Sequence, residues 1–310
     1  MSRAALYCAS LLIDWYAGRT GRAYRLVERH GGDPTVCVAE GEGNRLAVAV
    51  APLFEPDSDA EAEDARAFME ERLSAGLVRG PFMLWAPPRA AVPSSEPEAS
   101  LFTQHVQQAA APLLPGARGE VQLPVAVQMA KVRDEGGYAS VIGGLSRWWT
   151  LITERVNGTF HVNSTKMRRA PQSSQLRESL FDRIGELAAP MQTGDAIEFD
   201  TFEAWTVQRL HEEPLGETGF AIIQAPPRID PADGTLMRRL VRRRLRDASE
   251  ALGGVDATIK AVGLIAVYEY AEHETVGSFV KSLSPDVYAG IPFISAIVDG
   301  EVRPIFLPRE

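Results

Sequence analysis

The sequence predicts an α/β protein that contains two related strand–helix–strand units and mixed sheets. Stretches with the periodicity of helices and stretches with the periodicity of strands follow one another along the whole chain. One short pattern also occurs twice, at residues 82–89 and 220–228. The length of 310 residues suits two domains, which we place at residues 1–150 and 151–310.

The N-terminal third begins with a predicted helix over residues 3–18, where Leu6, Leu11, Leu12 and Tyr16 recur at helical spacing. Three strands are expected to follow as a meander, at residues 24–28, 35–39 and 45–53. The segments between them are rich in Gly, Asp, Pro and Asn, which is the composition of tight turns.

The remaining elements are predicted from the same periodicities. Further helices are expected at residues 57–71, 101–113, 173–189, 235–252 and 276–283. Further strands are expected at 81–86, 121–132, 196–210, 220–225, 259–270 and 291–298. The glycine-rich segment 136–150 is interpreted as a crossover between the two halves.

The repeated pattern is a short apolar strand that ends in Ala-Pro-Pro-Arg, first at Phe82–Arg89 and again at Phe220–Arg228. Each copy is followed by a predicted helix and then by a long apolar strand. We interpret this as two units with one plan, each with a parallel strand pair joined by a right-handed crossover. The alternative is that Pro-Pro simply ends two unrelated strands.

Composition restricts the function. The net charge of −9 argues against a surface that is basic throughout, although a local basic patch remains compatible with it. The two cysteines, Cys8 and Cys37, are too few for a disulfide framework. No apolar run approaches the length of about 18 residues that a membrane span needs. We therefore expect a cytoplasmic protein with no membrane partner.

The order of helix, strand, Gly-Gly-Asp-Pro turn, strand, turn and strand over residues 3–90 resembles the start of PD-(D/E)xK nucleases, the restriction-endonuclease-like superfamily. The resemblance implies a nuclease-like topology, with a metal-binding acid on one strand and an acid-x-lysine on the next. Here the position of the first acid holds Thr35, Val36 and Cys37. The position of the acid-x-lysine holds residues 47–51, which are all apolar. We therefore expect a degenerate site. Asp33, Glu40 and Glu42 are nearby, on predicted turns.

A second candidate site is the strand at residues 196–210. Glu198, Asp200 and Glu203 could present carboxylates there, and Lys260 begins a later strand. Two acids on one strand face can bind a divalent cation, so Mg²⁺ is the cofactor if this site is a nuclease site. Otherwise no cofactor is predicted. The alternative interpretation is a charged outer face that protects an edge strand.

A third candidate is the basic helix at residues 235–252. Five arginines are spaced so that they share one face, with Arg244 at its edge: Arg238, Arg239, Arg242, Arg243 and Arg246. Binding to phosphates or to an acidic protein would neutralise the charge of this face. Lys166, Arg168 and Arg169 form a second basic cluster. A plain solvated face is the alternative. The run Arg147-Trp148-Trp149 could stack on a base, or could belong to a core or an interface.

The leading hypothesis is a diverged, non-catalytic nuclease-fold protein that binds nucleic acid or an acidic partner through the arginine-rich helix. The first alternative is a metal-dependent nuclease with its site at Glu198, Asp200 and Lys260. The second is a homo-oligomeric scaffold, such as a homodimer, with Trp85, Trp148 and Trp149 at the interface. In that case the arginines would pair with the acidic segment 57–71 of a neighbouring copy.

Overall fold

The computed structural model describes residues 3–30, 32, 34–53, 60–224, 234–266 and 272–307. The chain divides into two compact units. Unit 1 comprises residues 1–119 and 206–310, and unit 2 comprises residues 120–205. The boundary expected near residue 150 falls inside unit 2, because unit 2 is an insertion between two parts of unit 1.

The α/β class is confirmed, and most predicted elements are present within a few residues of their expected ends. Unit 1 contains α1 (Arg3–Thr20), β1 (Tyr24–His30), β2 (Thr35–Gly41), β3 (Asn44–Pro52), α2 (Ala60–Ser74), β4 (Pro81–Trp85), α3 (Glu98–Ala110), η3 (Pro214–Gly216), β9 (Gly219–Ile223), α6 (Gly234–Gly253), β10 (Ile259–Ala266), α7 (Glu272–Lys281), η4 (Pro285–Tyr288), β11 (Phe293–Val298) and β12 (Glu301–Phe306). Unit 2 contains β6 (Gly137–Gly143), η2 (Ser146–Trp148), α4 (Trp149–Thr153), β7 (Gly158–Ser164) and α5 (Ser174–Ala188). Strands β5 (Arg118–Arg133) and β8 (Ala196–Arg209) have residues in both units.

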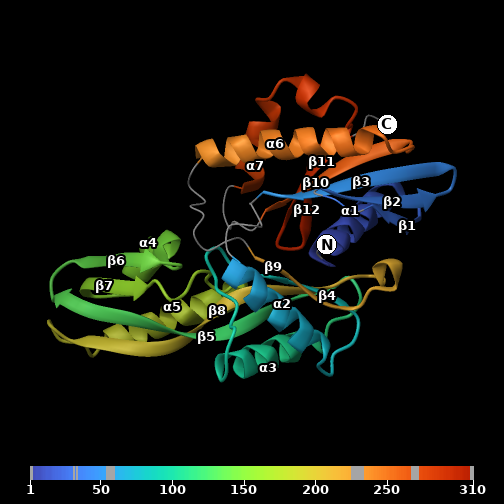
Figure 1. Ribbon diagram of the computed structural model, residues 1–310. Helices are drawn as coiled ribbons and strands as arrows, with labels where there is room; N and C mark the ends of the chain where they lie inside the picture. Colours follow the sequence, from blue (N-terminus) through green and yellow to red (C-terminus); the bar gives the residue numbers. More distant parts are fainter. Residues whose placement is uncertain are drawn as a thin grey trace. The chain divides into compact units, whose positions relative to one another are not determined.

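The first of two six-stranded sheets lies entirely in unit 1 and has the order β1-β2-β3-β10-β11-β12. Strands β1, β2 and β3 form the predicted antiparallel meander. β10 is parallel to both β3 and β11, so the sheet is mixed. Helices α1 and α6 cover opposite faces of its central strands (Figure 1).

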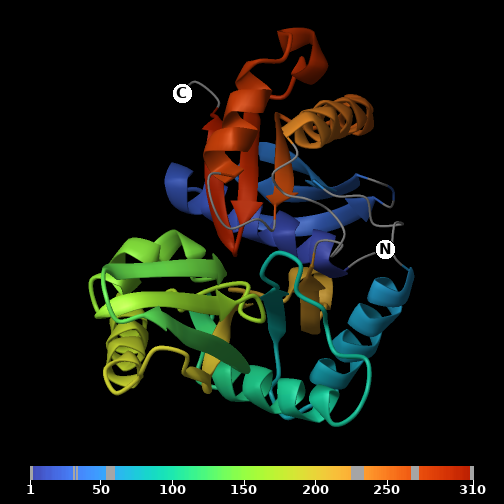
Figure 2. The same ribbon diagram turned by 90° about the vertical axis from the view of Figure 1, so that its left-hand side faces the viewer.

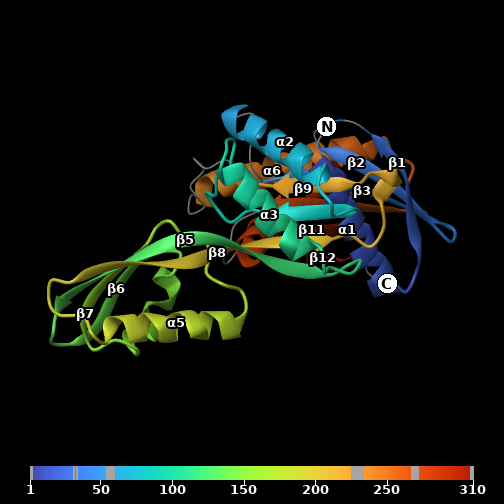
Figure 3. The ribbon, with the colours of Figure 1, turned by 90° about the horizontal axis from the view of Figure 1, so that it is seen from below.

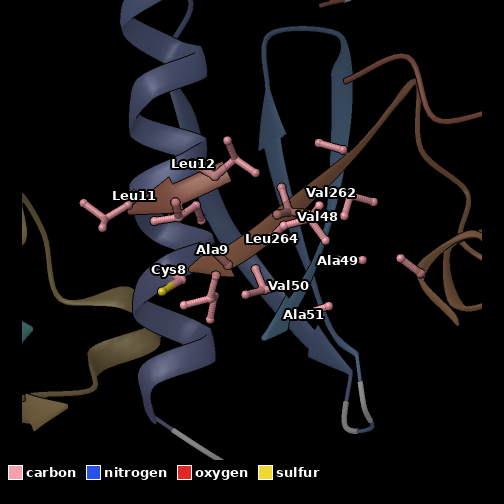
Figure 4. Close-up of a cluster of buried hydrophobic side chains, with 14 of the residues drawn as sticks. Cys8, Ala9, Leu11, Leu12, Val48, Ala49, Val50, Ala51, Val262 and Leu264 are labelled. Carbon is pink, nitrogen blue, oxygen red and sulfur yellow. The ribbon is translucent and has the colours of Figure 1, made fainter. Parts of the chain in front are cut away.

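The centre of this sheet is apolar on both faces, as expected for strands covered on both sides. Leu12 of α1, Val48 of β3 and Val262 of β10 are fully buried and belong to one core cluster (Figure 4). Gly263 lies where α1 crosses β10. A Cβ there would come within 3.3 Å of the side chain of Leu12 and 2.8 Å of that of Ile297, so glycine fits this position without displacing either side chain.

The second sheet has the order β6-β7-β5-β8-β4-β9. Its last two strands are the two copies of the repeated pattern, and they pair in parallel with Phe82 opposite Phe220 and Trp85 opposite Ile223. The two Phe rings stack with centroids 4.9 Å apart. The predicted strand–helix–strand pairs are not formed as expected. β8 separates β4 from β5, and β10 belongs to the other sheet from β9.

Strands β4 and β9 are covered on both faces within unit 1. Met83 and Trp85 on β4 and Ile223 on β9 are buried in the same core cluster as α1. Helices α2 and α3 lie on the other side of this strand pair (Figure 2). Helix α1 is therefore enclosed between the first sheet and the β4–β9 pair.

In unit 2, α5 packs along one face of the strands and supplies Leu180, Phe181 and Ile184 to a separate core cluster (Figure 3). The segment expected to be a crossover, residues 136–150, instead forms β6, η2 and the first residues of α4. Gly136 lies in the turn between β5 and β6, where its φ of +83° is a conformation that glycine adopts readily. Strand β7 was not predicted, and it pairs with both β6 and β5.

The enclosure of α1 predicts which leucines matter for stability. We expect Leu12→Ala to lower the free energy of unfolding by about 2–5 kcal/mol, because Leu12 is fully buried and its removal leaves a cavity. Leu114, whose side chain is 73% exposed, is the matched control, and Leu114→Ala should change stability by less than about 0.5 kcal/mol. Urea denaturation measures both, and equal effects would contradict the enclosure of α1.

Candidate nucleic-acid interface

Helix α6 has one buried side and one charged side, as its sequence predicts. Its buried side chains pack on the first sheet, on α7 and on η4: Met237, Leu240, Val241, Arg244, Leu245, Ala248 and Leu252. Arg244 corrects the prediction, because it lies on the buried side rather than at the edge of the charged stripe. It is 3% exposed, and its Nε donates a hydrogen bond to the carbonyl of Pro52 at 3.0 Å.

The other five arginines of α6 are all exposed, and we call them the arginine surface: Arg238, Arg239, Arg242, Arg243 and Arg246. The guanidinium of Arg238 lies 5.5 Å from the ring centroid of Phe279 on α7. Within the described part of the chain, no carboxylate forms an ion pair with Arg239, Arg242 or Arg246. These three cations are therefore held on one helix without an ion-pair partner among the described residues.

The charge along α6 changes sign near its C-terminal end. A hollow of about 700 Å³ lies there, between α6 and the meander, and its charged lining is mostly acidic: Glu28, His30, Arg45, Asp247, Glu250 and Asp256. Arg45 is engaged with Glu28 at 3.5 Å and with Glu40 at 3.4 Å. Anions are thus favoured along the arginine surface and disfavoured beyond its C-terminal end.

The second predicted basic cluster does not form a basic surface. Arg169 is 1% exposed, in the interior of unit 2. Arg168 lies 3.6 Å from the buried carboxylate of Glu203, which also accepts the backbone N–H of Arg168 at 2.6 Å. Only Lys166 is well exposed, and it lies 4.0 Å from Glu198. Burial and local pairing remove this cluster from the candidate interface.

The residues of the predicted metal site belong to different units and different sheets. Glu198 and Asp200 lie on β8 in unit 2, whereas Lys260 lies on β10 in the first sheet of unit 1, opposite Ala47. Glu198 accepts a hydrogen bond from Gln128 at 2.9 Å. The described residues contain no group of three or more His, Cys, Asp or Glu side chains that could hold a metal ion.

The positions where the resemblance implies catalytic residues hold buried side chains, and none of them is an acid or a lysine. Val36 and Cys37 on β2, and residues 47–51 on β3, are all in the core. Glu40, expected on a turn, is in β2 and pairs with Arg45. Asp33 lies outside the described residues. Trp85, expected at an oligomer interface, is fully buried in unit 1 and cannot contact a partner in this fold.

One hollow was not anticipated from the sequence. It measures about 430 Å³ and lies between α1, β1 and η3, with Asp14, Tyr24, Glu212 and Glu213 in its wall. A buried carboxylate oxygen of Asp14 and the hydroxyl of Tyr24 have no hydrogen-bond partner among the residues that the structure describes. Burial raises the pKa of Asp14 to about 6, the charge of His211 opposes this, and Glu212 adds to it. The sequence signal that could have indicated this hollow is Asp14, an acid within an otherwise apolar stretch of the predicted helix.

Comparisons with models of protein families, with curated proteins and with solved structures found no match to this chain. The described helices include none long and apolar enough to cross a membrane. The functional argument therefore rests on the side chains of the chain itself.

The shifted pKa of Asp14 predicts a pH dependence. Because the folded state raises this pKa from 3.8 to about 6, it favours the protonated carboxyl, so stability falls as the pH rises from about 4 to about 6 and is constant above. We expect Asp14→Asn to stabilise the fold by about 1–2 kcal/mol at pH 7, allowing for partial solvation, and by little at pH 4.

Thermal unfolding at pH 4, 5, 6 and 7 measures this difference. Asp64→Asn, at an exposed position of α2, is the control and should give no such trend. A gain from Asp14→Asn that is the same at pH 4 and pH 7 would contradict the shifted pKa.

Proposed function

We propose that this chain is a diverged nuclease-fold protein, without a catalytic site of its own, that binds nucleic acid through the arginine surface of α6. The observation that carries the proposal is five exposed arginines on one face of one helix, three of which have no carboxylate partner among the described residues. Like charges on adjacent turns repel one another, so such a face is stabilised when an anion binds to it.

The density of charge favours phosphates over carboxylates as the binding partner. Arg238 to Arg246 spans about 12 Å along the helix axis, with five guanidinium groups in that length. Duplex DNA carries about one negative charge per 1.7 Å, and guanidinium groups bind phosphate oxygens bidentately. A nucleic-acid backbone offers this density along its whole length, whereas an acidic protein would need a matching cluster of carboxylates. An acidic protein is therefore the less favoured partner.

The nuclease-like part of the proposal is supported by the first sheet. The helix and the three-stranded meander on which the resemblance rests are present as α1, β1, β2 and β3. The apolar, buried residues at the implied catalytic positions support a binding role rather than cleavage. Glu198 and Asp200 belong to a different sheet from Lys260, so the sheet topology lends the nuclease alternative no support.

The proposal predicts binding that depends on salt and on the arginine surface. We expect labelled duplex DNA to bind at low salt, with log affinity falling against log salt with a slope of about −4 if four or five phosphates are contacted. Arg242→Glu combined with Arg243→Glu should abolish most of this binding. Fluorescence anisotropy between 50 and 200 mM salt, with and without Mg²⁺, would measure it.

The matched control is Arg19→Glu combined with Arg22→Glu. This pair is exposed at and just after the end of α1 and changes the net charge by the same amount. Equal losses in the two double variants would indicate a non-specific charge effect and contradict the assignment to α6. Binding to acidic peptides but not to nucleic acid would replace the phosphate proposal with the acidic-partner alternative.

A further inference from the structure

Unit 2 carries a second group of exposed side chains that the arginine surface does not include. Tyr138 on β6 is 49% exposed, and Trp149 at the start of α4 is 45% exposed. Their ring centroids are 6.0 Å apart and the rings are tilted by 57°, so the two rings are not stacked face to face on each other. We call Tyr138, Arg147, Trp148 and Trp149 the aromatic surface.

Trp148 anchors this surface to the core of unit 2. It is half-buried, and its ring lies 6.1 Å from that of Phe181 on α5. The guanidinium groups of Arg147 and Arg177 each lie 4.7 Å from its centroid. Arg177 is held in place, since it donates a hydrogen bond to the carbonyl of Pro171 at 2.9 Å. Arg147 is exposed, and no described carboxylate pairs with it.

The backbone around the aromatic surface is tied down at several points. The N–H of Ala139 donates to the hydroxyl of Thr153 at 3.0 Å, which fastens the short helix α4 to the edge strand β6. The N–H of Leu145 donates to the hydroxyl of Ser164 at 3.0 Å, and the N–H of Gly144 donates to the carbonyl of Met167 at 2.9 Å. The exposed rings are therefore preorganised, and binding to them requires little ordering of the chain.

We propose that the aromatic surface stacks against the bases of single-stranded nucleic acid, with Arg147 beside the phosphate backbone. This inference rests on the proposed function and names the form of nucleic acid that the chain prefers. Exposed Trp and Tyr rings beside a cation are the combination that binds unpaired bases without reading their sequence. In a duplex the faces of the bases are stacked on one another and are closed to such contacts.

The aromatic surface is small, which favours nucleotides over a protein as its binding partner. Among the described residues of unit 2, the large apolar side chains with substantial exposure are Val132, Tyr138, Ile142 and Trp149. A stable protein–protein interface buries about 800 Å² on each partner, drawn from about 20 residues or more. Two aromatic rings and one guanidinium suffice for one or two nucleotides.

The experiment compares three labelled probes at low salt: an oligothymidylate, an abasic strand of the same length, and a duplex. We expect the wild-type protein to bind the oligothymidylate more tightly than the abasic strand. Trp149→Ala or Tyr138→Ala should weaken binding to the oligothymidylate about tenfold and leave the abasic strand unchanged. Trp149→Phe retains an aromatic face and should restore most of the difference. Leu114→Ala, at an exposed apolar position in unit 1, is the matched control.

The outcomes distinguish this inference from the proposed function. Equal binding of the oligothymidylate and the abasic strand, or equal weakening of both by Trp149→Ala, would contradict base stacking on the aromatic surface. The proposed binding through the arginine surface of α6 would remain. Binding that is lost in Trp149→Ala but unaffected by Arg242→Glu with Arg243→Glu would overturn the arginine surface instead. A monomer–dimer equilibrium in sedimentation that Trp149→Ala abolishes, with no base-dependent binding, would assign these rings to self-association.

Discussion

The burial of α1 on both sides is the constraint on which the rest of unit 1 depends. An amphipathic helix needs one apolar stripe, but α1 has buried residues around its whole circumference and must be covered on two sides. The first sheet covers one side, and the β4–β9 pair covers the other. Because β4 and β9 come from segments about 140 residues apart, their parallel pairing holds the two parts of unit 1 together around the insertion of unit 2.

This arrangement leaves β9 as an edge strand, and side chains satisfy its free backbone groups. Ser74 and Glu70 of α2 accept the N–H groups of Phe220 and Ile222, at 2.9 and 2.8 Å. Arg3 donates to the carbonyl of Phe220 at 2.9 Å. Burial raises the pKa of Glu70, and the hydrogen bond from Ile222 and the charges of Arg66 and Arg3 oppose this. These bonds leave the edge of β9 with fewer free backbone groups that could pair with another chain.

The same enclosure explains why the charged surface is on α6 and not on α1. Helix α6 packs on only one sheet face, so its other face lies in solvent and can hold five cations. The chain as a whole carries a net charge of −9, so these cations stand out locally against an acidic background. A helix that concentrates cations in this way attracts a polyanion at short range and orients it, which is the physical basis of the proposed nucleic-acid contact.

The sequence by itself determined the α/β class, the meander and the two-sided character of α6, because all three follow from local periodicity and turn residues. Only the tertiary structure decided that the two copies of the repeated pattern pair with each other, that Arg169 and Arg244 are buried, and that Glu198 and Lys260 lie on different sheets. It also brought Tyr138 beside Trp149. The reason is that strand order and burial depend on contacts between distant segments, which local spacing does not encode.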